Sequence, residues 1–386
     1  MTAIEPGDAR ALTRALVQVD SRNPTLVPGG PGEGPCAALL RDVLDAWGFR
    51  TELHDAAPGR PNLVARIGGA EGGSGRSLMF NGHLDVVGVE GMIHPPFTAD
   101  ERDGRLYGRG SADMKGGIAA MCAAALRAVE AGARGEIVVA AVADEEYDSI
   151  GTRALLARGV RADACVVTEP TRLAIMPAHR GFAWIEVEVT GRAAHGSRWD
   201  IGVDAIRHAG LLLAELDAYD ADVLPARTHP LLGRGSLHAS LIEGGTGMST
   251  YPDRCVLKLE RRTIPGESAA AALDEVRRAC DRIRARRPSF VAEVRLLVTQ
   301  GPSDVSVSAP LVRGLDAALR ASGERVTVEG MSAWTDAALL NDAAIPAVCF
   351  GPGDISLAHA AEEYIPLDEI DRAATVLASF ARDWCA

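Results

Sequence analysis

The chain has 386 residues, more than the roughly 250 to 300 that one hydrophobic core usually organises, so two domains are expected. Hydrophobic residues make up 47% of the chain and charged residues 24%, a balance typical of folded globular proteins and not of disordered ones. The 40 basic and 52 acidic side chains give a formal charge of −12, and a surface of that sign disfavours nucleic acid and anionic membranes as partners.

The seven cysteines lie far apart in the sequence and form no Cys-x-x-Cys pair. This spacing argues against a disulfide framework and against a thiolate zinc site, and it favours a reducing compartment. The first residues show no basic stretch followed by an apolar one, and no apolar run approaches the roughly 20 residues that span a bilayer. We therefore expect a soluble cytoplasmic protein.

Helical and strand-like patterns alternate in the first half of the chain. Apolar residues at helical spacing predict helices over 8–20 and 36–48, and further helical stretches cover 114–132 and 152–159. Short apolar runs that end abruptly in polar residues predict buried strands over 78–80, 137–142, 165–167 and 347–350. This alternation predicts an α/β fold with a mostly parallel sheet flanked by helices, in which polar strand ends converge at one edge.

The middle of the chain has a different pattern. Apolar and polar residues alternate, as in half-exposed antiparallel strands, over 182–191, 255–264 and 290–298. Helical stretches over 203–217 and 268–287 lie between these segments. We therefore expect a second, α+β domain over 179–298, inserted into a first domain that comprises 1–178 and 299–386.

The polar residues near the strand ends and in one late segment are imidazoles and carboxylates: His83, Asp85, Asp113, Glu145, Glu146, Glu169 and His359. Imidazole and carboxylate without thiolate form the ligand set of catalytic zinc and related divalent ions. A single such residue would be an ordinary surface group. These seven residues, however, lie in five separate segments, and four of the five follow strand-like runs, whose ends a parallel sheet brings to one edge. The sequence therefore predicts a metal site there.

The number of ligands favours two metal ions. If each of the five segments supplies one ligand, the five ligands exceed the three that one catalytic zinc takes. If Asp113 bridges two ions, each ion receives three protein ligands. Glu145 and Glu146 are neighbours in an expected extended segment and point to opposite sides, so one is a ligand and the other is free to move protons. His83 and Asp85 are two residues apart and face the same way, so Asp85 can fix the tautomer or position of His83.

The segments NGHLDVV, GRGSADMKGG, DEE, TEP and GRAAHGS, followed by a late histidine, resemble the M20 family of dinuclear zinc amidohydrolases in sequence order. The resemblance implies a zinc-peptidase-like catalytic domain with an inserted α+β domain that serves as lid and dimerisation domain. It implies two divalent metal ions per chain, Zn²⁺ or Co²⁺. It also implies hydrolysis of the amide bond of an N-acyl amino acid, or of a related small peptide-like substrate, by a water that bridges the metals.

The resemblance assigns the metal ligands residue by residue. It implies that His83 and Glu169 bind one ion, and that Glu146 and His359 bind the other. Asp113 bridges the two ions.

The resemblance also assigns roles around the metals. Glu145 is implied to be the general base and acid, and Asp85 to support the ligands from behind. A cis peptide bond is implied between Asp113 and Met114.

In the expected lid, His195 of GRAAHGS corresponds to a family histidine that reaches the active site of the other subunit and stabilises the developing oxyanion. A homodimer through the lid is thus implied.

Arg262 occupies the position of a family arginine that binds the substrate carboxylate, so a small-molecule substrate with a free carboxylate is expected. Arg261 points to the opposite strand face and is expected to be solvated. The family segment GGxxxNxxP has asparagine where this chain has Ser249, so Thr250 or a nearby arginine are alternatives for holding the substrate.

Two other interpretations remain open. A dinuclear zinc aminopeptidase uses a similar ligand set but binds a free α-amine, which Arg262 and the inserted domain disfavour. A catalytically silent binding protein of the same fold would have lost a ligand or the base, and here all five ligands and Glu145 are present.

Overall fold

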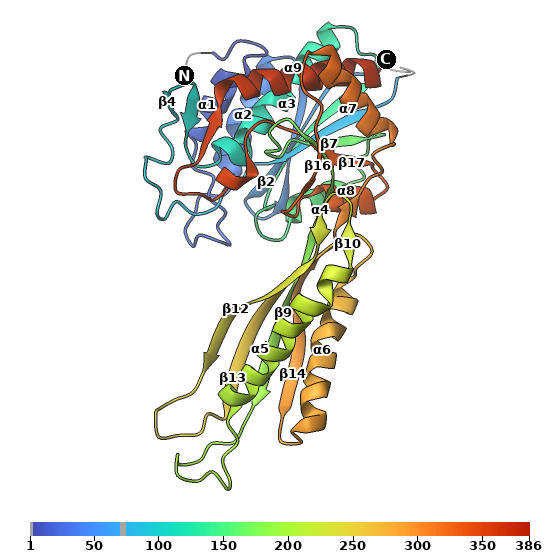
Figure 1. The fold of residues 1–386 in the computed structure, drawn as a ribbon. Coiled ribbons are helices and arrows are strands. Elements are labelled where there is room, and N and C mark those ends of the chain that lie inside the picture. Colours follow the sequence, from blue (N-terminus) through green and yellow to red (C-terminus); the bar gives the residue numbers. More distant parts are fainter. Residues whose placement is uncertain (1–2, 70–74) are drawn as a thin grey trace. The chain divides into compact units, whose positions relative to one another are not determined.

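The computed structural model describes residues 3–69 and 75–386, and these fold into two compact units (Figure 1). Unit 1 comprises Met1–Pro177, Val305–Glu329 and Thr335–Ala386. Unit 2 comprises Ala178–Asp304 and Gly330–Trp334. The sequence placed the two boundaries after residues 178 and 298, and it did not assign the short segment 330–334 to the inserted domain.

A mostly parallel sheet forms the centre of unit 1. Its strands follow the order β1-β2-β6-β3-β7-β17-β8. Their bounds are β1 Arg50–Ala57, β2 Arg60–Gly68, β6 Glu136–Val142, β3 Leu78–His83, β7 Cys165–Val167, β17 Ala347–Cys349 and β8 Ile175–His179. The strands β6, β3, β7 and β17 are parallel, which confirms the predicted α/β fold. The antiparallel pair β1–β2 was not predicted, because small and charged residues interrupt the apolar pattern of β1.

Helices cover both faces of this sheet (Figure 1). On one face lie α1 Ala9–Val17, α2 Gly34–Ala46, α3 Gly116–Glu130, α7 Pro310–Ala321 and α9 Leu367–Trp384. On the other lie α4 Ile150–Ala157 and α8 Ala337–Asp342. Because neither face meets water, β3 is buried along its whole length, as is β6 beyond its first residue. Such strands appear in the sequence as the continuous apolar runs that allowed their prediction.

The parallel strands end at one edge of the sheet, and the predicted polar residues follow there. Helix α3 passes close to this edge at Gly117, where a Cβ atom would lie 2.0 Å from the carbonyl oxygen of Thr168. Only glycine fits this contact. It brings the start of α3, and with it Asp113, next to the segment that carries Glu169.

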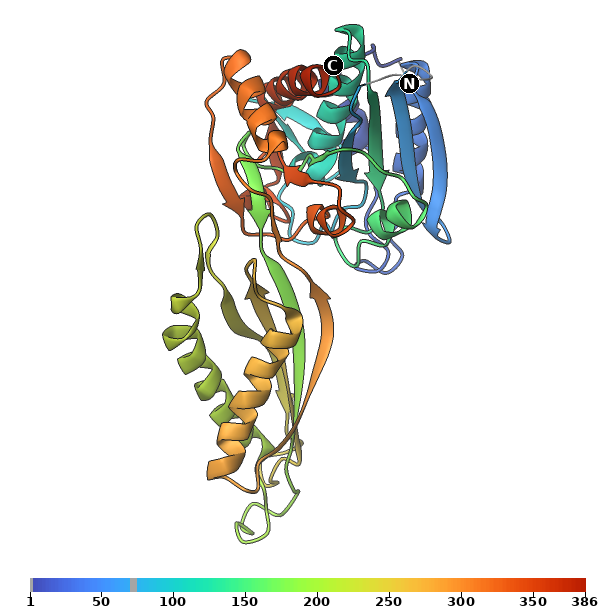
Figure 2. The same cartoon turned by 90° about the vertical axis from the view of Figure 1, so that its right-hand side faces the viewer.

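Unit 2 contains a four-stranded antiparallel sheet with the order β12-β13-β9-β14. The strands are β12 Ser236–Gly244, β13 Arg254–Thr263, β9 Gly181–Thr190 and β14 Val291–Gln300. Helices α5 Ala205–Asp222 and α6 Ala269–Arg286 pack against the same face, as Figure 2 shows. The strand β12 was not predicted, because a bulge between Ala239 and Leu241 breaks its alternation.

Short elements complete the chain: β4 Asp100–Arg102, β5 Arg105–Tyr107, β10 Thr228–His229, β11 Gly233–Arg234, β15 Ser303–Asp304, β16 Val328–Met331, β18 Tyr364–Pro366, the π-helical turn Ser111–Lys115, and the 3₁₀ turns Leu224–Ala226 and Ile355–Leu357. The seven cysteines are free and buried. Within residues 3–69 and 75–386, no helix has both the length and the apolar composition needed to cross a membrane.

Candidate metal centre

The predicted imidazoles and carboxylates of unit 1 meet at the end of the parallel strands. Two groups of three residues each have ligand atoms within 4.8 Å of one another, namely His83, Glu145 and Glu169, and His83, Asp113 and Glu146. His359 joins the second group, because its Nε2 lies 2.9 Å from Oε2 of Glu146 and 3.6 Å from Oδ2 of Asp113. Residues more than 270 positions apart in the sequence thus form one cluster.

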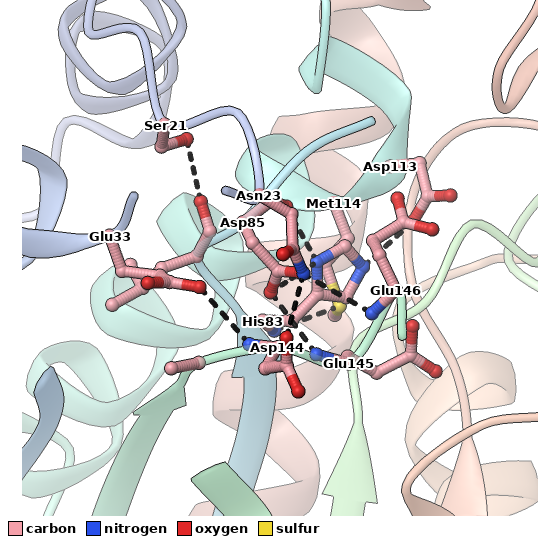
Figure 3. Close-up of polar contacts among 12 residues, drawn as sticks. Ser21, Asn23, Glu33, His83, Asp85, Asp113, Met114, Asp144, Glu145 and Glu146 are labelled. Carbon is pink, nitrogen blue, oxygen red and sulfur yellow. Dashed lines mark hydrogen bonds and ion pairs between the residues drawn. The ribbon is translucent and has the colours of Figure 1, made fainter. Parts of the chain in front are cut away.

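Asp113 and Met114 lie against the end of β3 (Figure 3). The peptide bond between them is cis, as the sequence resemblance implied. Oδ1 of Asp113 lies 3.0 Å from Nε2 of His83, and the sulfur of Met114 accepts a hydrogen bond from the backbone N–H of His83 at 3.3 Å. Asp113 thus contacts the ring of His83, and Met114 contacts its backbone.

Asp85 contacts the ring of His83 mainly through its main-chain carbonyl, whereas the sequence argument expected its side chain to make this contact. Nδ1 of His83 donates to the main-chain carbonyl of Asp85 at 2.8 Å and lies 3.7 Å from its carboxylate. The carboxylate instead accepts the backbone N–H groups of Glu145 at 3.2 Å and Glu146 at 3.3 Å, and the side-chain amide of Asn23 at 2.8 Å (Figure 3). The alternation argument failed because β3 ends at His83.

Glu145 and Glu146 also depart from the extended geometry that the sequence predicted. They lie in a turn after β6. This turn begins directly after Asp144, whose backbone is in the left-handed region (φ 66°). The two carboxylates nevertheless separate, since Glu145 falls in the group with Glu169 and Glu146 in the group with Asp113.

A buried polar network supports this turn from behind. Oδ1 of Asp144 accepts hydrogen bonds from Asn23 and from Arg60, both at 2.9 Å. Arg60 also pairs with Glu33, which is fully buried, at 2.6 Å, and Glu33 accepts the backbone N–H of Asp144 at 3.2 Å. We did not identify these residues from the sequence, because isolated polar residues in a loop or at the start of a strand carry no pattern that marks their partners.

The electrostatics of the cluster favour a bound cation. Burial raises the pKa of Glu145 well above its usual range, and the charge of Glu169 raises it further. Burial and the charge of Asp113 raise the pKa of Glu169 in the same way. The hydrogen bond to Glu146 raises the pKa of His359 to about 9. Imidazole and carboxylate donors crowded together, with His83, Asp113 and Glu169 buried, fit divalent ions, which would supply positive charge there.

In unit 2, the loops that carry His195 and Ser249 lie side by side. The backbone N–H of Gly196 donates to the carbonyl oxygen of Ser249 at 2.7 Å, and His195 forms an isolated β-bridge with Thr250. The side chain of His195 is exposed, and its Nδ1 lies 2.8 Å from the hydroxyl of Ser197. The segments of His195 and Ser249, which the sequence analysis singled out separately, are therefore hydrogen-bonded neighbours in this unit.

Arg261 and Arg262 lie on opposite faces of β13, but the expectation that Arg261 is solvated was wrong. Arg261 is only 1% exposed and donates to Glu275 of α6 at 3.0 Å. The helix-covered face accepts this arginine because Glu275 supplies a buried counter-charge. Arg262 lies on the other face, partly exposed, and pairs with Glu260.

The sequence model of peptidase family M20/M25/M40 matches residues 79–383. The chain belongs to this family. It is 35% identical to the acetylornithine deacetylase of Myxococcus xanthus over 357 residues, which cover 89% of this chain and 90% of that protein. It is 28% identical to an N-formyl-4-amino-5-aminomethyl-2-methylpyrimidine deformylase of Bacillus subtilis over 376 residues, which cover 90% of this chain and 88% of that protein.

Solved structures share the fold of this M20 chain. The aminopeptidase PepT of Bacillus cereus matches with a TM-score of 0.81 at 20% identity over 100% of both chains. A dinuclear metal-binding M20 peptidase of Bacillus subtilis matches with a TM-score of 0.75 at 17% identity over 97% of both chains. The predicted family is thus confirmed, and the chain is a metal-dependent hydrolase.

Proposed function

We propose that this M20 protein binds two divalent ions and cleaves the amide bond of an N-acyl amino acid or of a related small peptide-like substrate. One observation carries the proposal: Asp113 directs its two carboxylate oxygens at two different histidines. Oδ1 lies 3.0 Å from Nε2 of His83, and Oδ2 lies 3.6 Å from Nε2 of His359. A carboxylate in this position suits a bridge between one ion on each side.

The remaining ligands follow from this bridge. We assign one ion to His83 and Glu169 and the other to Glu146 and His359, with Asp113 shared. Two ions held there, Zn²⁺ or Co²⁺, would polarise the scissile carbonyl and make a water molecule more acidic.

Glu145 is the group that we assign to proton transfer. It belongs to the cluster with His83 and Glu169 but is not needed as a ligand once Asp113 is shared. Its carboxylate takes a proton from the attacking water as the new C–O bond forms. It then gives that proton to the nitrogen as the C–N bond breaks, so the amine leaves uncharged.

We assign recognition of the substrate to unit 2. Arg262 is partly exposed and suited to bind a substrate carboxylate by two parallel hydrogen bonds, in exchange for its contact with Glu260. Ser249 would assist at the position where the family has asparagine. His195, in the loop beside Ser249, would stabilise the oxyanion in the active site of a second subunit.

We further propose a homodimer through unit 2, located in the cytoplasm. The strand β12 is an edge of its sheet and exposes Leu241 and Ile242, with exposed fractions of 62% and 57%. An exposed apolar edge strand is suited to pair with another chain. The seven free, buried cysteines suit a reducing compartment.

The test is a substrate screen on protein stripped with a chelator and reloaded with Zn²⁺ or Co²⁺. It compares N-acetyl, N-succinyl, N-formyl and N-carbamoyl derivatives of ornithine, citrulline, diaminopimelate and glutamate with aminoacyl anilides. We expect metal-dependent hydrolysis of an acyl amino acid and none of the anilides. The opposite result would indicate an aminopeptidase, and binding without turnover would indicate a silent binding protein.

The number of ions is tested separately. Anomalous scattering from crystals of the loaded protein should show two ions about 3.5 Å apart on either side of Asp113. One ion at full loading, or ligands other than the five assigned, would refute the assignment.

A further inference from the structure

Glu363 is a fully buried carboxylate with four hydrogen-bond donors around it. Its Oε1 accepts the backbone N–H groups of Ala112 at 3.0 Å and Asp113 at 3.2 Å. Its Oε2 accepts the backbone N–H of Gly110 at 3.0 Å and the guanidinium of Arg109 at 2.7 Å. A buried carboxylate with this many partners is strongly fixed in place.

All four donors belong to one short segment, 109–113, which ends at the proposed bridging residue. The backbone here is irregular: Gly110 has φ 79°, and Asp113 has non-helical angles (φ −119°, ψ 93°) inside a π-helical turn. Backbone N–H groups in such a segment have no regular ladder to pair with and need other acceptors. Glu363 supplies the acceptor for three of them, and so sets the path of the chain up to Asp113.

Glu363 also borders the loop that carries His359. His359 has a left-handed backbone (φ 61°), and its side chain is 53% exposed, with Glu146 and Asp113 as its neighbours. Glu363 lies four residues after His359 in the chain, and its main-chain carbonyl accepts the backbone N–H of Gly108 at 3.2 Å. Glu363 therefore ties the loop of His359 to the segment of Asp113 through both its side chain and its backbone.

We propose that Glu363 is a positioning residue that sets the distance between Asp113 and His359, and thereby the affinity for the ion that these two residues share with Glu146. This inference rests on the proposed function, since it presumes the two-ion site. The ion on the other side of Asp113 depends on Glu363 only through Asp113, so it should be affected far less.

A neutral amide cannot replace this carboxylate. Each oxygen of Glu363 accepts two hydrogen bonds, and a glutamine would turn its NH₂ group toward two donors whichever way its amide is oriented. The substitution would also leave Arg109, which is 3% exposed, without its counter-charge. The segment before Asp113 should then shift away from the loop of His359.

The experiment compares Glu363→Gln with Glu362→Gln, which makes the same chemical change at the exposed neighbour. Metal-free protein is titrated with Co²⁺ and followed by calorimetry and by the visible absorption of the bound ion. Wild type and Glu362→Gln should bind two ions. In Glu363→Gln, one ion should keep its affinity and the other should bind about 10- to 100-fold more weakly, with a changed spectrum.

Two ions bound to Glu363→Gln with unchanged affinities and spectra would overturn the inference while leaving the proposed function intact. An equal fall in both affinities would also overturn it, because it would indicate a general loss of structure. Wild type that binds no pair of Co²⁺ ions would refute the proposed function itself, and the inference with it. If Glu363→Gln does not fold, Glu363→Asp keeps the charge on a shorter side chain and must show the same selective loss.

Discussion

The main-chain carbonyl oxygen of Asp85 lies 2.8 Å from Nδ1 of His83. A carbonyl oxygen can only accept, so Nδ1 carries the proton, and the lone pair of Nε2 is free to bind a metal beside Asp113. The carboxylate of Asp85 is then available for a second task, which is to hold the backbone of Glu145 and Glu146. Because backbone and side chain act separately, a side-chain substitution should leave His83 undisturbed.

The first prediction concerns Asp85→Asn. All three groups that face the carboxylate are donors, so an amide NH₂ there would oppose one of them and displace the turn that carries Glu145. We expect kcat to fall about 10- to 100-fold while two ions per chain are retained. Metal analysis and steady-state kinetics measure both quantities. Loss of the ion that His83 binds would show that the carboxylate, and not the carbonyl, orients the imidazole.

The second prediction separates the two neighbouring glutamates. Glu145→Gln should keep both ions and lose about 10²- to 10⁴-fold in kcat, which is the usual contribution of a general base. Glu146→Gln makes the same change one residue along and should lose one ion. The metal content of the two variants therefore distinguishes base from ligand. An ion missing from Glu145→Gln would place Glu145 among the ligands instead.

The parallel sheet and the cluster of ligands could be predicted from the sequence because both follow from simple physical rules. Strands covered on both faces, such as β3 and β6, are continuous apolar runs. Parallel strands end at one edge, so the residues that follow them meet there. His83, Glu145 and Glu169, which end or follow β3, β6 and β7, could therefore be grouped from the sequence.

The support around the cluster could not be predicted in this way. Arg60 and Glu363 are single polar residues whose partners lie 84 and about 250 positions away, and no local pattern marks such pairs. Arg261 was assigned to solvent because strand alternation predicts only the face on which a residue lies. Whether that face tolerates a charge depends on Glu275 of α6, and therefore on tertiary packing.

The third prediction contrasts Arg261 with Arg262. Arg261→Met removes a guanidinium that pairs with Glu275, which is 4% exposed, so unit 2 should lose about 3 kcal/mol of unfolding free energy. Arg227 still faces Glu275 and limits the loss. Arg262→Met removes a partly exposed pair and should cost at most about 1 kcal/mol.

Substrate binding should rank these two variants in the opposite order to stability. Arg262→Met should raise KM for a substrate with a free carboxylate, whereas folded Arg261→Met should change KM little. Urea unfolding and steady-state kinetics on both proteins supply the comparison. If Arg262→Met had an unchanged KM, its role in binding the carboxylate would be excluded.

The fourth prediction uses the pH dependence of stability. Burial lowers the pKa of His179 to about 4, whereas the unfolded chain has a value near 6.5. Between these values the unfolded chain binds a proton that the folded chain does not. The contribution of His179 is therefore complete above pH 6.5 and is lost as the pH falls toward 4, by up to about 3 kcal/mol.

This loss should be visible in urea unfolding curves that are measured from pH 7 down to pH 4.5. His179→Gln cannot titrate and should show a smaller loss over this range than wild type. His238→Gln, at an exposed position, should match wild type. Equal pH dependence in all three proteins would mean that His179 is not held neutral by burial.

The fifth prediction is that His195 acts on the active site of the partner subunit. Removing a donor to a developing oxyanion typically costs about 3 to 4 kcal/mol, so His195→Ala should lose about 10²- to 10³-fold in kcat with its metal content unchanged. The decisive step is to mix His195→Ala chains with Glu145→Gln chains and let subunits exchange.

In such a heterodimer, action across the dimer gives one site that carries both defects and one site that carries neither. The intact site combines Glu145 of one chain with His195 of the other, so activity should reappear on mixing. Action within one chain leaves a defect in each site, and no activity returns. Native mass spectrometry shows whether heterodimers have formed. Once it does, an inactive mixture means that His195 serves its own chain or has no part in the reaction.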